Sequence, residues 1–91
     1  MMKSKKSFSI EGNILANSYH GQAGQPFCIH RVRFSNGKYA IVQEASGICF
    51  KPGDIIQRND CEWFYKTTQI RLLSFEYLED NESRRQFLEY Q

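Results

Sequence analysis

The stretch FCIHRVRFSNGKYAIVQE, residues 27–44, carries the strongest fold signal in the chain. Two runs of residues that favour β-strands flank the dipeptide Asn36-Gly37. Asn-Gly commonly supplies the two positive-φ residues of a type I′ turn, the tight connection of a β-hairpin. We therefore predict a hairpin of two strands, 27–34 and 39–44.

A two-residue turn fixes the register of this hairpin by counting. The pairs Phe34 with Tyr39 and Val32 with Ile41 place their apolar side chains on one face, which we expect to be the core face. Arg31 and Arg33 then lie on the opposite face, beside the small residues Val42 and Ala40, where a partner can reach them. The predicted pairs are Phe34 with Tyr39, Val32 with Ile41, and His30 with Gln43.

Turn and helix-capping residues follow the hairpin. Lys51-Pro52-Gly53-Asp54 places Pro and Gly at the two central positions of a β-turn. Asp80 or Asn81 is a suitable N-cap for a short helix over 82–90 that buries Phe87. The remaining expected elements are a strand over 7–17 with a bulge or bend at Gly12, a long loop over 18–26, a turn over 45–47, and strands over 48–50, 55–57, 61–66 and 70–78. The last two are either separate closing strands or one strand bent at 67–69.

The run VRFSNGKYAIVQEASGICFKPGDII, from Val32 to Ile56, resembles the pattern of many SH3-like barrels, in which a hairpin is followed by a Pro-Gly-Asp turn that leads into a strand. The resemblance implies a fold and carries no functional residue with it. Short strands separated by turns, without βαβ alternation, also favour a barrel. We predict a mostly β fold: a five- to six-stranded SH3-like or OB-like barrel over 7–79, a basic tail over 1–6, and a short helix or tail over 80–91.

Composition and charge limit the function only broadly. The chain has 91 residues, enough for one domain, and a formal net charge of +2. Eight Lys or Arg against four acids give residues 1–60 a charge of +4, whereas four basic and six acidic residues give 61–91 a charge of −2. A dedicated nucleic-acid-binding domain usually has a stronger bias. We interpret the pattern as a solvated surface, with anion binding as the alternative.

Cysteine usage and the lack of targeting signals favour a cytoplasmic protein. Cys28, Cys49 and Cys61 are an odd number without close pairing, which does not indicate a disulfide framework. The first residues lack the apolar run of a signal peptide, and no stretch reaches the length of a membrane span. We expect free thiols and a bacterial or phage origin.

No metal, cofactor or catalytic site is predicted. Cys28, His30, Cys49 and Cys61 include the residue types of a Cys₃His zinc site, but the C-x₂₋₄-C spacing of such sites is missing. We interpret the cysteines as small core residues. Cys28 with either histidine lacks the orienting group and oxyanion hole that a nucleophilic pair needs, so we expect no enzyme.

The leading hypothesis is a small binding module that contacts another protein, as a regulatory subunit or a phage-type inhibitor would. The alternative is a nucleic-acid-binding barrel with a basic face and aromatic side chains that stack on bases. Trp and Tyr side chains are common in protein-binding surfaces and in base-stacking surfaces, and they are also common in cores. The candidate partner-binding residues are Arg31, Arg33, Lys38, Lys51, Arg58, Trp63 and Tyr65.

Overall fold

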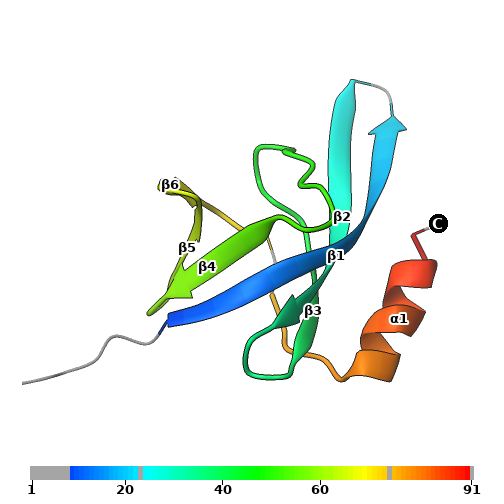
Figure 1. The fold of residues 1–91 in the computed structure, drawn as a ribbon. Helices are drawn as coiled ribbons and strands as arrows, with labels where there is room; N and C mark the ends of the chain where they lie inside the picture. The colour runs from blue at the N-terminus through cyan, green and yellow to red at the C-terminus, as the bar shows by residue number, and fades with distance from the viewer. Residues whose placement is uncertain (1–8, 23, 74, 91) are drawn as a thin grey trace, which may run out of the picture.

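The computed structural model describes residues 9–22, 24–73 and 75–90, which form a six-stranded antiparallel sheet and a short C-terminal helix (Figure 1). The predicted mostly β fold is therefore confirmed. The strands lie side by side in the order β3-β2-β1-β4-β5-β6. The elements are β1 Ser9–Gln22, β2 Gln25–Phe34, β3 Tyr39–Val42, β4 Ile55–Asn59, β5 Glu62–Tyr65, β6 Thr68–Ile70 and α1 Asp80–Leu88.

The β2–β3 hairpin forms, but its register differs by one residue from the predicted one. Tyr39 and Ile41 consequently leave the core face, and Ala40 and Val42 are buried in their place. The alternation of apolar residues in β3 is compatible with either face, so only the turn could decide the register. The observed pairs are Arg33 with Tyr39, Val32 with Ala40, Arg31 with Ile41, and His30 with Val42.

The turn of this hairpin causes the shift because it has three residues, 35–37, rather than two. The Phe34 carbonyl accepts a hydrogen bond from Gly37 N–H at 2.9 Å, and Phe34 N–H donates to the Lys38 carbonyl at 2.8 Å. Gly37 alone in this turn has a positive φ, of 86°. This pattern is that of a type I turn followed by a glycine bulge, and the predicted type I′ turn is wrong.

The core lies on one face of the sheet, with Phe34 near its centre. The Phe34 ring lies 5.7 Å from Trp63 and 5.5 Å from Tyr77 between ring centroids. The loop after β3 and the segment after β6 complete this core, since Phe50 and Tyr77 come from them. Its buried members are Ile14, Val32, Phe34, Ala40, Val42, Phe50, Ile56, Trp63 and Ile70.

Strand β1 includes residues that the sequence predicted as a loop. Instead of ending near Asn17, it continues to Gln22, and β2 begins at Gln25. The glycines and polar residues of 18–26 led to the loop prediction, yet they form an antiparallel pair of strands. The irregularity in β1 lies at Leu15 rather than at Gly12.

Gly12 is required for close packing and not for a bend. A Cβ atom at this position would lie 2.7 Å from Phe34 Cε1 and 2.8 Å from Val32 Cγ1. Those side chains occupy the space in which a larger residue would sit.

Among the other turns, the predicted Lys51–Asp54 turn is confirmed. Asp54 N–H donates to the Lys51 carbonyl at 2.9 Å, and Gly53 has a φ of 100°. The strand predicted over 48–50 is absent, since these residues form irregular loop. The strand predicted over 61–66 is confirmed as β5, whereas the alternative of one bent strand is wrong because β5 and β6 form a hairpin. The strand predicted over 70–78 is also wrong, since β6 ends at Ile70 and the described residues between β6 and α1 are irregular.

The sheet is not closed into a barrel. The segment after β6 returns along β3, and two isolated bridges join Tyr39 to Leu78 and Glu44 to Leu72. These contacts bring the two ends of the sheet close to each other, but they do not form a continuous ladder of strands. The predicted number of strands agrees with the structure, whereas β1 and β2, with 14 and 10 residues, are longer than predicted and the predicted closure is wrong.

Helix α1 lies against β2 and β3 on the face opposite the core (Figure 1). It starts two residues before the predicted 82–90, and its N-cap is Glu79, which makes no side-chain capping hydrogen bond. Ser83 is the buried residue of the helix, whereas Phe87, which was predicted to be buried, is half-exposed.

Candidate functional site

The β1–β2 hairpin extends beyond its neighbours as a two-stranded arm, residues 16–22 and 25–29 (Figure 1). Strand β3 pairs only with residues 30–33 of β2, and β4 pairs only with residues 9–13 of β1. Within the described part of the chain, the outer edges of the arm therefore have no strand partner. An isolated two-stranded hairpin is marginally stable, so the arm needs other contacts to hold its shape.

The loop after β3 supplies those contacts by binding the inner face of the arm. Asn17 Nδ2 donates to the Phe50 carbonyl at 2.7 Å, and Phe50 N–H donates to His30 Nε2 at 2.9 Å. Both backbone groups of Phe50 are thus bound by side chains of β1 and β2. The Phe50 side chain is itself buried in the core, so the loop joins the arm to the rest of the domain.

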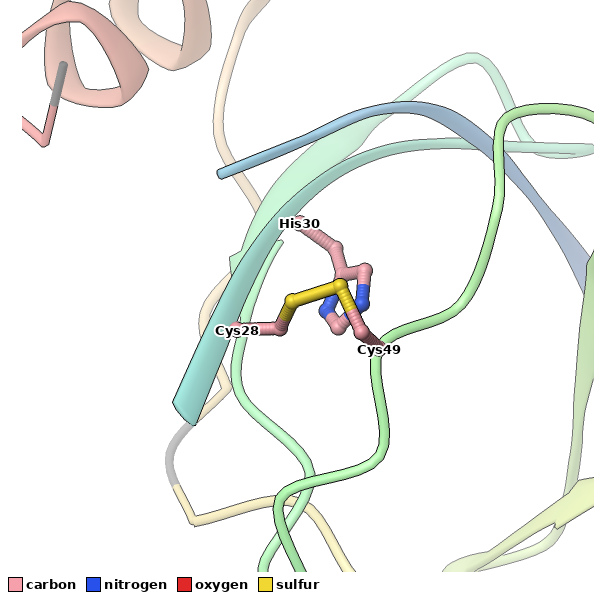
Figure 2. A group of neighbouring side chains, drawn as sticks. All are labelled: Cys28, His30 and Cys49. Atoms are coloured by element: carbon pink, nitrogen blue, oxygen red, sulfur yellow. A yellow bond between two sulfur atoms is a disulfide. The ribbon is translucent and has the colours of Figure 1, made fainter. Parts of the chain in front are cut away.

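A disulfide between Cys28 and Cys49 strengthens this junction (Figure 2). The two Cα atoms are 5.2 Å apart, Cys28 is buried and Cys49 is exposed. The prediction of three free thiols in the core is therefore wrong. Cys61 alone is free, and it is exposed rather than buried.

The disulfide also removes one support for the predicted cytoplasmic location, because disulfides persist mainly in oxidising compartments. The location remains a prediction. No helix within the described residues is long and apolar enough to span a membrane.

His30 completes the junction as a neutral, buried side chain. Burial lowers the pKa of His30, an effect opposed by its hydrogen bond to the Val42 carbonyl and by the charge of Glu44. Since Nε2 accepts from Phe50 N–H, the ring proton sits on Nδ1, which donates to the Val42 carbonyl at 3.3 Å. His30 therefore fixes the end of β3 and the loop after it at once.

The same three residues resemble a metal-ligand set, since the Cys28, His30 and Cys49 ligand atoms lie within 4.8 Å of one another. Metal ions bind thiolates and a free imidazole lone pair. In this structure the two sulfurs are joined to each other and the Nε2 lone pair is occupied by Phe50 N–H. The arrangement braces the arm.

Exposed apolar side chains gather where the disulfide meets the arm. Tyr19, the cross-strand partner of Cys28, is 65% exposed. Ile48 precedes Cys49 and is 45% exposed. Residues 12–30 contain no Asp, Glu, Lys or Arg, so the whole arm is uncharged. We did not predict this site from the sequence, although its charge-free run is visible there.

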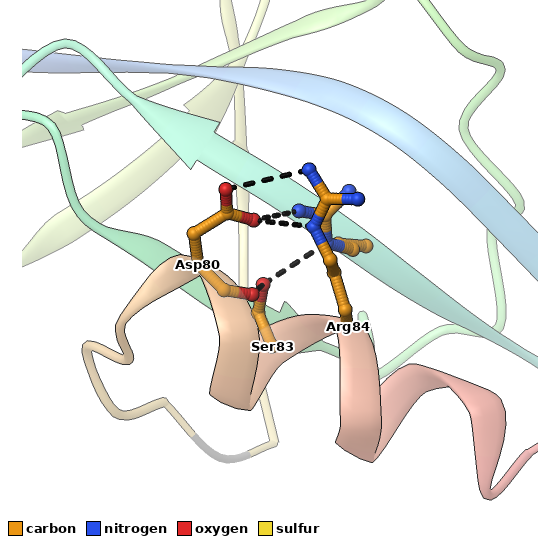
Figure 3. A network of polar contacts seen from close by, with 4 residues as sticks. Asp80, Ser83 and Arg84 are labelled. Atoms are coloured by element: carbon orange, nitrogen blue, oxygen red, sulfur yellow. Dashed lines mark hydrogen bonds and ion pairs between the residues drawn. The ribbon is translucent and has the colours of Figure 1, made fainter.

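Arg31, a predicted partner-binding residue, is instead committed to holding α1. Its Nη2 contacts Asp80 Oδ1 at 2.6 Å, and its Nε donates to Ser83 Oγ at 2.9 Å. Asp80 also pairs with Arg84 (Figure 3), whose Nε lies 2.9 Å from Asp80 Oδ1. The hydrogen bond from Arg84, with smaller effects from Arg31, lowers the pKa of Asp80. The guanidinium of Arg31 is thus not free for a partner.

The other predicted cations do not form one basic face. Lys38 pairs with Glu79 at 2.8 Å, and Arg58 lies over the rings of Trp63 and Phe75. Arg33 and Lys51 are exposed and form no ion pair within the described residues. Arg33 lies beside Tyr39, not beside Ala40 as predicted.

The two predicted aromatic residues belong to the core or its margin. Trp63 is only 8% exposed and packs against Phe34, so it is not available to stack on a base. Tyr65 is half-buried, lies 4.7 Å from the Phe50 ring between centroids, and has Lys66 Nζ over its own ring. Their shared role is packing.

One serine–histidine contact, Ser18 Oγ to His20 Nε2 at 3.1 Å, invites comparison with a catalytic pair. The Ser18 hydroxyl donates to the Tyr90 carbonyl at 3.1 Å. Its proton is therefore directed away from the imidazole that would have to accept it. The hydrogen bond from Ser18 to Tyr90 connects β1 to the segment that follows α1.

The chain matches no protein-family model, no curated protein and no solved structure.

Proposed function

We propose that this protein is a non-enzymatic binding module that acts through protein–protein contact, with the arm as its docking surface. The observation that carries the proposal is a braced, uncharged hairpin with two unpaired edges. Bracing by the Cys28–Cys49 disulfide and by His30 supports this function, because a preorganised surface loses less conformational freedom on binding.

The unpaired edges suit a partner that adds a strand to the sheet. Exposed strand edges invite pairing with another chain, and proteins usually protect them with charged residues or Pro. The arm has no charged residue, and Pro26 is its one proline. In strand addition the backbone supplies hydrogen bonds and side-chain pockets supply specificity. Tyr19 on the arm and Ile48, which precedes the disulfide-bonded Cys49, offer exposed apolar contacts.

Nucleic acid is the less supported partner. Affinity for nucleic acid depends on cations that are free to neutralise phosphates. Arg31 and Lys38 are held in ion pairs, and Trp63 is buried. Of the predicted partner-binding cations, Arg33 and Lys51 are exposed and outside any ion pair among the described residues, and the further exposed cations Lys66 and Arg71 lie elsewhere in the chain.

We also propose that the sheet is an opened relative of the small SH3-like or OB-like barrels. Six antiparallel strands and the two bridges after β6 support this view. The long β1–β2 arm extends past the region that such a barrel would enclose, which accounts for the incomplete closure.

A pull-down with two matched variants tests the proposed function. Tyr19→Lys places a charge on the arm, and Leu73→Lys places one on another exposed apolar residue, after β6. From a nuclease-treated lysate, we expect the wild type and Leu73→Lys to retain the same protein and Tyr19→Lys to lose it. Retention that requires nucleic acid, or that is equal for all three proteins, would contradict the proposal.

A further inference from the structure

Two buried polar atoms lack a hydrogen-bond partner among the described residues: Arg58 Nε and Tyr77 Oη. Leaving a buried donor unpaired is costly, so such atoms are rare and call for an explanation. Both residues line the same cavity of about 500 Å³, which lies near the start of β1 and the β4–β5 turn. The cavity is lined by Ile10, Asn36, Arg58, Asp60, Cys61 and Tyr77.

The placement of Arg58 is unusual for a cation. It pairs with Ile10 and with Trp63, a core residue, so it projects from the core-facing side of β4. An inward-pointing charge can protect a sheet edge, but β4 lies between β1 and β5 in the interior of the sheet. Its guanidinium lies 5.6 Å and 5.5 Å from the ring centroids of Trp63 and Phe75, and no ion pair joins it to an acid among the described residues.

Tyr77 is held next to this cation. The Phe75 ring, which Arg58 covers, lies 4.8 Å from the Tyr77 ring between centroids. The fixed aromatic rings hold both polar groups at the cavity. Arg58 Nε and Tyr77 Oη are themselves buried, so binding through them would require the long Arg58 side chain to rotate toward the ligand.

We propose that this cavity is a binding site for a small apolar carboxylate, a function beyond the contact made by the arm. A carboxylate accepts hydrogen bonds from a guanidinium and from a phenol hydroxyl, which are the two donors left unpaired here. Its single negative charge can pair with Arg58, and Asp60 at the same cavity repels it less than it would repel the double charge of a phosphate dianion. The volume is that of a small-molecule site.

Cys61 provides a direct measure of occupancy. It lines the cavity, and it is the one free thiol of the chain's three cysteines. A bound molecule should slow the reaction of Cys61 with the neutral reagent iodoacetamide. The probes are phenylacetate, its neutral analogue phenylacetamide, and inorganic phosphate.

We expect phenylacetate to protect Cys61 in a saturable manner with a dissociation constant of about 5 mM, the range set by typical ligand efficiency for so small a molecule. Phenylacetamide and phosphate should bind at least about tenfold more weakly, since a hydrogen bond to a charged group is lost or a charge is misplaced. Absence of protection, or equal protection by phenylacetamide or phosphate, would overturn the proposal.

Variants separate binding from folding. Tyr77→Phe and Arg58→Met should each weaken phenylacetate binding about tenfold, while Arg33→Met, at an exposed arginine elsewhere, should leave it unchanged. Tyr77→Phe removes an unpaired buried hydroxyl, so the unliganded variant should unfold at a higher temperature than the wild type. A Tyr77→Phe protein that is less stable, or that binds phenylacetate as well as the wild type does, would refute this assignment.

Discussion

The disulfide that braces the arm offers a stability prediction with a defined magnitude. Cys28 and Cys49 are separated by 21 positions in the sequence. The chain-entropy relation for a loop of that length gives about 3 kcal/mol at room temperature, because the bond restricts the unfolded chain. Loss of the bond should therefore lower the midpoint of thermal unfolding by about 12 to 24 °C in a domain of this size.

The assay is urea unfolding followed by the fluorescence of Trp63, the single tryptophan, which is buried in the core. Cys49→Ala removes the bond at its exposed end and leaves the buried Cys28 in place. Both proteins carry Cys61→Ser, which prevents exchange with the free thiol. Dithiothreitol should destabilise the parent as much as Cys49→Ala does, and should not affect that variant. A loss below about 1 kcal/mol would refute the bracing role.

Three further stability predictions concern single residues. Arg31→Met should cost about 2 kcal/mol in urea unfolding because it removes charge-assisted hydrogen bonds to α1, whereas the exposed Arg33→Met should change stability by less than about 0.5 kcal/mol; equal effects would contradict the different roles given to the two arginines. Gly12→Ala should cost about 1 to 3 kcal/mol in the same assay, since its Cβ would overlap Phe34, and an unchanged midpoint would show that the core can adjust. Burial lowers the pKa of His30 in the folded state below its unfolded value of 6.5. The stability that this neutral side chain contributes is therefore complete above pH 6.5 and declines as the pH falls from 6.5 toward the folded pKa. This decline in the free energy of unfolding should be absent in His30→Gln, and an unaltered decline in that variant would assign the pH dependence to another group.

Local signals predicted the elements of the fold better than they predicted its pairing. The Lys51–Asp54 turn follows from residues that act on their immediate neighbours, and the C-terminal helix was predicted in place although its N-cap is Glu79 rather than Asp80 or Asn81. The hairpin register does not, because Asn36-Gly37 fits both a two-residue turn and the three-residue turn that forms. One residue of difference moves Tyr39 and Ile41 out of the core.

The candidate site was less predictable because it depends on residues distant in the sequence. Cys28 and Cys49 show no spacing motif, and they become neighbours only when the loop after β3 folds onto the arm. Likewise, nothing local in the sequence indicates that Arg31 binds Asp80, 49 positions away. From the sequence alone, an exposed arginine cannot be distinguished from one that is paired with a helix.

Site-specific photocrosslinking tests the role of the arm most directly. Benzoylphenylalanine is placed at Tyr19, and at Leu73 as the control, and the irradiated adducts are digested with protease or with nuclease. We predict a discrete adduct from position 19 that protease removes and nuclease does not, and no such adduct from position 73. Adducts of equal yield at both positions, or an adduct from position 19 that nuclease removes, would contradict a protein-binding arm.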